Sequence, residues 1–181
     1  MIIGFDLDEV FVSHPPLIPS SLILKLYGEK ANGKLTYRIP GTFEQYVRKI
    51  SHISLLRPPL QKNIEILKEK AKKSHIECFL ISSRYSFLQK ETDVLLEKYK
   101  LSRIFKKVFL NYENLQPHLF KERVLKKIKI ERYVDDDLPL LLFLAPKFPR
   151  IHFFWLNKDT DYSLKTNLHA ITKFASVFDS I

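Results

Sequence analysis

The sequence predicts an α/β protein in which a parallel sheet is covered by helices on both faces, with a small, mainly helical insertion after the first strand. Short apolar runs alternate along the chain with stretches in which apolar residues recur at helical spacing, as in proteins built from strand–helix–strand units. The first apolar run begins at Ile2 and stops at Asp6, and a second carboxylate follows at Asp8. Residues 13–57 differ from the rest of the chain in their proline and glycine breaks and in their charge.

Each element of the predicted core follows from such a pattern. Residues 2–6 are expected to form the first strand, because they are apolar and end in a carboxylate. After Pro58 and Pro59, apolar residues at every third or fourth position predict a helix over 60–71. The other predicted strands lie at 76–81, 107–110, 132–134 and 151–156, and the other predicted helices at 87–99, at 118–127, just after Pro139 and at 165–178.

Residues 13–57 are predicted to form the insertion, which leaves residues 1–12 and 58–181 as the core domain. The segment holds seven Lys or Arg against two Asp or Glu, a net charge of +5 out of +10 for the whole chain. We expect it to fold over the carboxyl ends of the strands as a lid that supplies positive charge to a substrate. It is predicted to contain a helix, a turn and a second helix, at 22–27, 31–34 and 43–50.

Composition limits the classes of protein to which the chain can belong. Its 181 residues are 45% hydrophobic, which is enough for a buried core. A single cysteine, Cys78, excludes a disulfide framework and is typical of a reducing cytoplasm. The acidic start of the chain does not resemble a signal peptide, and the longest other apolar run, 138–146, is too short to span a bilayer. We therefore expect a cytoplasmic protein without a membrane segment. Its positive charge favours phosphates, nucleotides or nucleic acid as partners, without choosing among them.

Polar residues follow three of the predicted strands. Because the strands of a parallel sheet end at the same edge, these side chains can converge there. Each group has a simpler interpretation when taken alone: the first pair of acids could be solvated, the serines could cap a helix, and the lysine could lie on the surface. The last acidic run could form a turn or an N-cap for the helix after Pro139. The residues are Asp6 and Asp8, Ser82 and Ser83, and Asp135-Asp136-Asp137, with Lys121 on the helix before the last of these strands.

In this order the polar residues resemble the four motifs of the haloacid dehalogenase (HAD) superfamily of phosphatases. The resemblance covers the chain outside residues 13–57, and it implies a HAD-like Rossmannoid core with a C1-type cap as the insertion. Glu9 departs from it, because many members have Gly at that position. The motifs match Asp6-Leu7-Asp8, Ser82 at the end of Phe79-Leu80-Ile81, Lys121 (with Lys126 and Lys127 as rivals) and Asp135-Asp136.

The resemblance also implies a reaction, the Mg²⁺-dependent hydrolysis of phosphomonoesters through an aspartyl-phosphate. Asp6 would be the nucleophile and Asp8 the general acid and base. Ser82 would donate to a phosphoryl oxygen, and Lys121 would neutralise charge. Mg²⁺ would be held by Asp6, by the carbonyl of Asp8 and by the acidic pair Asp135 and Asp136, of which Asp136 is the usual ligand. Ser83 and Arg84 would contact the substrate, a small anionic phosphate ester such as a nucleotide.

Two other functions fit parts of the sequence. A metal-dependent nuclease of the PIN kind also gathers carboxylates at the edge of a parallel sheet, and the basic charge suits it. Such a nuclease does not require a serine and a lysine between its acidic motifs. A non-catalytic module that binds nucleic acid or protein would not need the complete set of acids. The phosphatase is therefore the preferred interpretation, with nucleic acid as a less favoured partner.

The remaining unusual residues are assigned to the structure rather than to a site. The six histidines show no spacing typical of metal ligands. Trp155 follows Phe153 and Phe154 in an apolar run, and we expect all three in the core.

Overall fold

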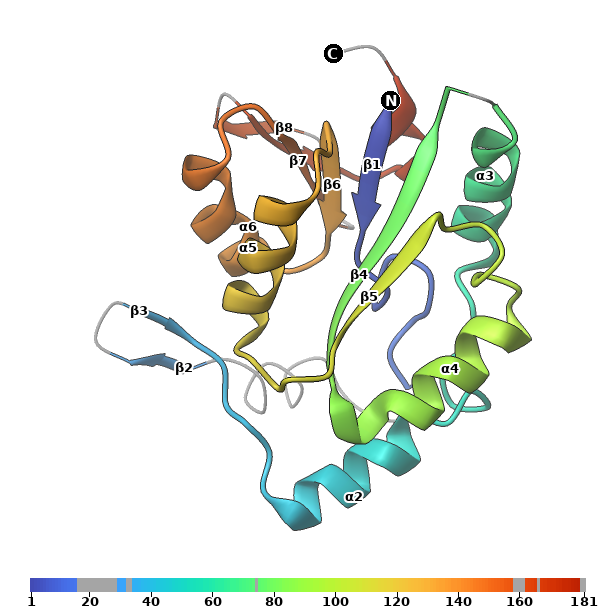
Figure 1. Ribbon diagram of the computed structural model, residues 1–181, viewed down its shortest axis with the longest axis vertical. Helices are drawn as coiled ribbons and strands as arrows, with labels where there is room; N and C mark the ends of the chain where they lie inside the picture. Colours follow the sequence, from blue (N-terminus) through green and yellow to red (C-terminus); the bar gives the residue numbers. More distant parts are fainter. Residues whose placement is uncertain (16–28, 32–33, 74, 158–161, 166, 180–181) are drawn as a thin grey trace.

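The computed structural model describes residues 1–15, 29–31, 34–73, 75–157, 162–165 and 167–179, and it confirms the α/β class (Figure 1). The strands of the main sheet are β1 (Ile2–Phe5), β4 (Glu77–Tyr85), β5 (Lys107–Asn111), β6 (Arg132–Asp135), β7 (His152–Leu156), β8 (Tyr162–Lys165) and β9 (Leu168–Ile171). Within the described residues their order is β5-β4-β1-β6-β7-β9-β8. Neighbours run parallel except for β8, which is antiparallel to β9.

Helices cover both faces of the sheet because successive side chains of each central strand point to opposite faces. On β1, Ile3 and Phe5 pack into one apolar cluster, and on β4 Leu80 joins that cluster while Ile81 joins the other. The first face is covered by α3 (Gln61–Ala71), α4 (Gln89–Lys98) and the short helix η3 (Phe174–Phe178), and the second by α5 (Pro117–Lys127) and α6 (Leu138–Leu144) (Figure 1). Single turns, η1 (Ser86–Leu88) and η2 (Ala145–Lys147), precede α4 and follow α6.

Gly4 leaves the space in which Tyr133 of the neighbouring strand packs. A Cβ atom at Gly4 would lie 2.9 Å from Cδ2 of Tyr133 and 3.0 Å from Cδ1 of Ile130. Cores packed at this density do not accept an additional carbon without a shift of their neighbours. The hydroxyl of Tyr133 donates a hydrogen bond to Asp135, so the close packing at Gly4 fixes the position of one strand-end carboxylate.

The described part of the insertion lies at the end of the sheet toward which β1 points (Figure 1). It contains a hairpin of β2 (Glu29–Ala31) and β3 (Lys34–Thr36) and the helix α2 (Thr42–Ser51). Helix α2 confirms the helix predicted over 43–50, and the two short strands flank the predicted turn. The helix predicted over 22–27 lies outside the described residues.

The two ends of the insertion are hydrogen-bonded to each other. The backbone N–H of Ser13 donates to the carbonyl of Pro58 at 3.0 Å, and the N–H of Leu60 donates to the carbonyl of Phe11 at 2.8 Å. The chain therefore leaves and re-enters the core at a single place.

The helix predicted over 165–178 is wrong. The chain there completes β8, forms β9 and ends in the short helix η3. Leu168 and Ala170 are buried and alternate with the half-buried His169, which is the period of a strand. A short apolar pattern does not distinguish the two kinds of element. Near the end of the chain, Phe174 and Val177 keep helical spacing, and both are buried in the first apolar cluster.

Cys78 is a free thiol buried on β4, and burial raises its pKa to about 12. In the described part of the chain, every helix is too short or too polar to cross a bilayer.

Candidate active site

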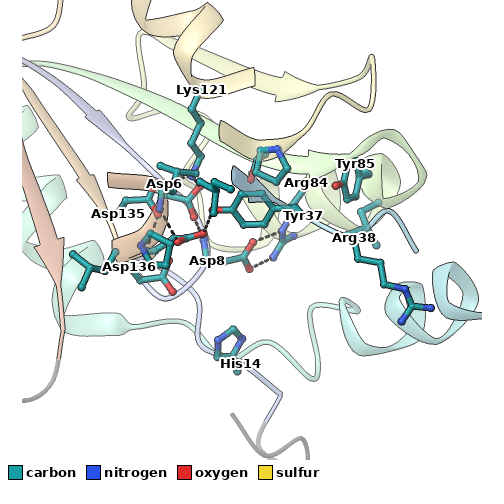
Figure 2. Close-up of a pocket in the computed structure, with 18 of the residues that line it drawn as sticks. Asp6, Asp8, His14, Tyr37, Arg38, Arg84, Tyr85, Lys121, Asp135 and Asp136 are labelled. Atoms are coloured by element: carbon teal, nitrogen blue, oxygen red, sulfur yellow. Dashed lines mark hydrogen bonds and ion pairs between the residues drawn. The ribbon is translucent and has the colours of Figure 1, made fainter. Parts of the chain in front are cut away.

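Side chains from the carboxyl ends of neighbouring strands and from the insertion line one cavity of about 710 Å³. This volume lies in the range typical of small-molecule sites. The strands β4, β1 and β6 are adjacent and parallel, so their ends open on the same edge. The core contributes Asp6, Asp8, Ser83, Arg84, Lys121, Asp135, Asp136 and Asp137, and the insertion contributes His14, Tyr37, Arg48, His52 and Arg57, among others (Figure 2).

Lys121 connects two of the strand-end carboxylates. Its Nζ lies 2.8 Å from Oδ1 of Asp6 and 2.6 Å from Oδ2 of Asp135, and its side chain is only 3% exposed. The hydroxyl of Tyr133 donates to the same oxygen of Asp135 at 2.9 Å. The rival lysines are both exposed on the outer side of α5: Lys126 and Lys127. Of the candidate lysines, Lys121 is the one that reaches the carboxylates.

Burial makes this group of carboxylates costly to ionise. Burial raises the pKa of Asp6 to about 7, and the charges of Asp135 and Asp8 act in the same direction while Lys121 opposes them. Burial, together with the charges of Asp135 and Asp6, also raises the pKa of Asp136 well above its ordinary value. When Asp6, Asp135 and Asp136 are all ionised, the single positive charge of Lys121 leaves the group with a net charge of −2. A divalent cation would balance it.

The arrangement of oxygen atoms fits a hard cation such as Mg²⁺. Oxygens of Asp6, Asp135 and Asp136 lie within 4.8 Å of one another. Both oxygens of Asp135 already accept hydrogen bonds, Oδ2 from Lys121 and Tyr133 and Oδ1 from the backbone N–H of Asp137 at 3.1 Å. Among the described residues, no donor contacts the carboxylate of Asp136. Asp136 is therefore better placed than Asp135 to bind the cation.

Changing Asp136 to Asn should remove most of the stabilisation by Mg²⁺. In the unchanged protein we expect Mg²⁺ to raise Tm more at pH 8 than at pH 5. The carboxylates must be ionised to bind a cation, and the pKa of Asp6 is about 7. Without metal, Asp136→Asn should melt at a higher temperature, because it loses repulsion among buried acids. Thermal unfolding with Mg²⁺ or with EDTA measures both effects.

The control for this measurement is Asp93→Asn, the same chemical change at an exposed position of α4. It should leave the response to Mg²⁺ unchanged. If Mg²⁺ raised the Tm of Asp136→Asn as much as that of the unchanged protein but no longer raised the Tm of Asp135→Asn, the metal ligand would be Asp135 instead of Asp136.

Asp8 is bound by two arginines. Nε and Nη2 of Arg84 donate to Oδ2 and Oδ1 of Asp8 at 2.8 and 2.6 Å (Figure 2). Nη1 of Arg57 lies 3.1 Å from Oδ1. Burial acts to raise the pKa of Asp8, but Arg84 and Arg57 together outweigh it and hold this pKa well below its usual range. In this arrangement Asp8 is ionised.

No protein-family model and no curated protein matches the sequence. The structure is similar to a haloacid dehalogenase-like family hydrolase from Xanthomonas campestris, with a TM-score of 0.57 and 12% identity over 97% of this chain and 92% of that one. It is also similar to a haloacid dehalogenase-like family hydrolase from Streptococcus pneumoniae, with a TM-score of 0.51 and 12% identity over 87% and 84% of the two chains. The chain has the haloacid dehalogenase-like fold.

In this HAD-like core, Ser83 lines the cavity and Ser82 does not. On β4, Ile81 faces the side covered by α5, so Ser83 continues on that side, from which Lys121 reaches Asp6. Ser82 points the other way, is 1% exposed, and accepts a hydrogen bond from the N–H of Arg84 at 3.4 Å. Donation to a phosphoryl oxygen, the role predicted for Ser82, fits Ser83 better.

Several residues around the cavity were not predicted. Tyr37 of the insertion donates from its hydroxyl to Oδ2 of Asp137 at 2.6 Å. The side chain of Gln116 binds both backbone groups of Tyr37, at 2.7 and 2.8 Å. Two more cavity residues, Arg57 and His52, come from the insertion. Arg57 is one of its seven basic residues, which we expected to supply positive charge, whereas nothing in the sequence pointed to His52.

Asp137, just after β6, and Trp155, on β7, also lie at this edge of the sheet; the sequence left the role of Asp137 open, and the expectation that Trp155 lies in the core is wrong. Asp137 caps α6, since its Oδ1 accepts from the N–H of Leu140 at 3.0 Å. Phe153 and Phe154 are buried as expected, but Trp155 is only half-buried and lines the cavity. Its Nε1 donates to the carbonyl of Asp136 at 2.9 Å, which helps to position that residue.

Proposed function

We propose that the protein is a Mg²⁺-dependent phosphomonoester hydrolase that acts through a phosphorylated Asp6. The observation that supports this most strongly is the contact of 2.8 Å between Asp6 and a buried lysine, inside a cavity that also contains Asp8 and Asp136. A carboxylate can approach an anionic phosphate only where nearby positive charge offsets their repulsion. Lys121 supplies part of that charge. The HAD-like fold of the chain adds the general expectation of a hydrolase.

In the proposed first step, a carboxylate oxygen of Asp6 attacks phosphorus and the bond from phosphorus to the ester oxygen breaks. Asp8 gives a proton to the ester oxygen, which leaves as an alcohol. In the second step Asp8 takes a proton from water while that water attacks phosphorus, which releases inorganic phosphate and restores Asp6. When bound, Mg²⁺ would add positive charge beside the phosphoryl oxygens. Lys121 holds Asp6 in place through both steps.

The role proposed for Asp8 requires a change from the arrangement described above. Its two carboxylate oxygens are occupied by Arg84 and Arg57. To protonate a leaving oxygen, Asp8 has to turn away from these guanidinium groups, which hold its pKa low, and first take up a proton from solvent. Because side-chain rotation is fast and Asp8 is 24% exposed, such a change is available without unfolding of the core.

A comparison of three substrates tests this proposal. We expect Mg²⁺-dependent release of p-nitrophenol from p-nitrophenyl phosphate, no cleavage of a labelled oligonucleotide, and no release of chloride from a 2-chloro acid. Cleavage of the oligonucleotide alone would indicate a nuclease of the PIN kind, and release of chloride would indicate a dehalogenase. Inactivity on all three would favour a binding module.

A further inference from the structure

Helix α2 of the insertion turns a polar side toward the protein and an apolar side toward solvent. Arg48 and His52 are four residues apart and therefore share one side of the helix, and both are buried and line the cavity. Tyr46 and Ile50 are each two residues from Arg48, which places them on nearly the opposite side. Their exposed fractions are 64% and 44%. A surface helix ordinarily has the reverse arrangement, with its apolar stripe against the core.

The apolar face of α2 is continuous along the helix and is flanked by further exposed apolar residues. Because a large apolar side chain presents on the order of 150–200 Å² when fully exposed, this surface amounts to roughly 700 Å². An exposed apolar surface of this size marks an interaction site. The residues are Phe43, Tyr46, Val47 and Ile50, which we call the apolar face of α2, and Ile39, Ile53 and Leu55 beside the helix.

The character of this face fits a second copy of the chain better than a membrane. A helix that lies on a membrane carries Lys and Arg beside its apolar face. Beside the apolar face of α2 the charges are mixed in sign: Glu44, which pairs with Arg38 at 2.9 Å, and Lys49. Each partner of a stable complex contributes about 800 Å², and the interfaces of homodimers are the more apolar ones. The area and the composition of the face both match that case.

The apolar face of α2 is also complementary to itself in size. Most homodimers are related by a two-fold axis, which brings the same surface of both copies together. In an antiparallel pair of α2 helices, Phe43 of one copy lies level with Ile50 of the other, and Tyr46 lies level with Val47. Each aromatic side chain of one copy then meets a smaller, branched side chain of the other.

We propose that the protein forms a two-fold dimer in which the apolar faces of α2 pack against each other. Because the opposite side of α2 contributes Arg48 to the cavity, the partner copy would support one wall of the cavity from behind. Pairing of α2 does not depend on which reaction the cavity carries out.

Sedimentation equilibrium of the full chain at several concentrations tests the dimer. We expect a species of twice 21.4 kDa that dissociates on dilution. Tyr46→Glu places a charge in the middle of both contacting faces and should weaken the dimer by about a hundredfold or more, since an unpaired buried charge is costly. Glutamate favours helix, so α2 should persist, which circular dichroism checks. Tyr112→Glu, the same exchange at a residue that is 52% exposed after β5, is the control and should leave the dimer unchanged.

Cross-linking tests the contact itself. Val47→Cys places a thiol near the two-fold axis, beside the same thiol of the other copy. Mild oxidation should then join the two chains, because a disulfide requires Cα atoms within about 7 Å of each other. The native thiol of Cys78 is buried and should not compete. Tyr112→Cys, the control for an exposed thiol elsewhere, should remain unlinked.

Three results would overturn the proposal. The first is a monomer at every concentration, with Val47→Cys unlinked after oxidation. The second is a dimer that Tyr46→Glu leaves intact, which would place the interface on another surface. The third is a monomer that sediments with vesicles of phosphatidylglycerol through the same face, which would make α2 a membrane-binding helix.

Discussion

Asp6→Asn should lower the rate of p-nitrophenyl phosphate hydrolysis by at least about a hundredfold, because it removes the oxygen that attacks phosphorus. The amide keeps an acceptor for Lys121, and Lys121 keeps its contact of 2.6 Å with Asp135, so the fold should persist. Initial rates at saturating substrate, together with circular dichroism, check both parts.

Asp93→Asn provides the matched control for this measurement, since it makes the same change on the exposed side of α4. It should retain the full rate. A wild-type rate in purified Asp6→Asn would show that Asp6 is not the nucleophile.

Lys121→Met should be the most destabilising single change at the site. It leaves Asp6 and Asp135 buried without their common cation, and removal of one partner of a buried pair typically costs about 3–5 kcal/mol. Methionine has the helix propensity and approximate length of lysine, so α5 itself should be unaffected. Denaturant unfolding in EDTA measures the difference in free energy.

The loss in Lys121→Met should depend on pH. In the folded protein the pKa of Asp6 is about 7, against an ordinary value of 3.8, so the folded state binds more protons between these values. Stability from this proton is present at low pH and is lost as pH rises through about 7. Without Lys121 the ionised acids repel without compensation, so the loss should be larger at pH 8 than at pH 5. Lys126→Met, on the exposed side of the same helix, should cost little at either pH. A loss in Lys121→Met that is independent of pH would contradict this account.

The core of the fold could be predicted because its strands and helices differ in hydrophobic period. The strand ends at Asp6 and Asp135 follow from apolar runs that stop at carboxylates, and their convergence follows from parallel order alone. The C-terminal part could not be predicted in the same way, because Leu168 and Ala170 belong to a run too short to separate strand from helix.

The candidate site was predicted less completely than the fold. Lys121 was selected from three lysines, and the structure brings it to Asp6. The choice between Ser82 and Ser83 depends on which face of β4 each one occupies, and the register of the strand could not be determined from two adjacent serines. Tyr37 and Arg57 lie far from the motifs in sequence and reach the cavity through tertiary contacts, which local patterns do not encode.

The paired ends of the insertion separate the residues that we propose to react, Asp6 and Lys121, from the cavity residues that the insertion contributes, such as Arg57 and Tyr37. Because backbone hydrogen bonds join Ser13 to Pro58 and Leu60 to Phe11, the two ends of the segment lie side by side. A different segment could be grafted onto these ends, since neither β1 nor α3 would have to move. The grafted protein would keep Asp6 and Lys121 but lose Arg57 and Tyr37. New specificities could therefore arise by exchange of the insertion alone, while Asp6 and Lys121 keep their positions.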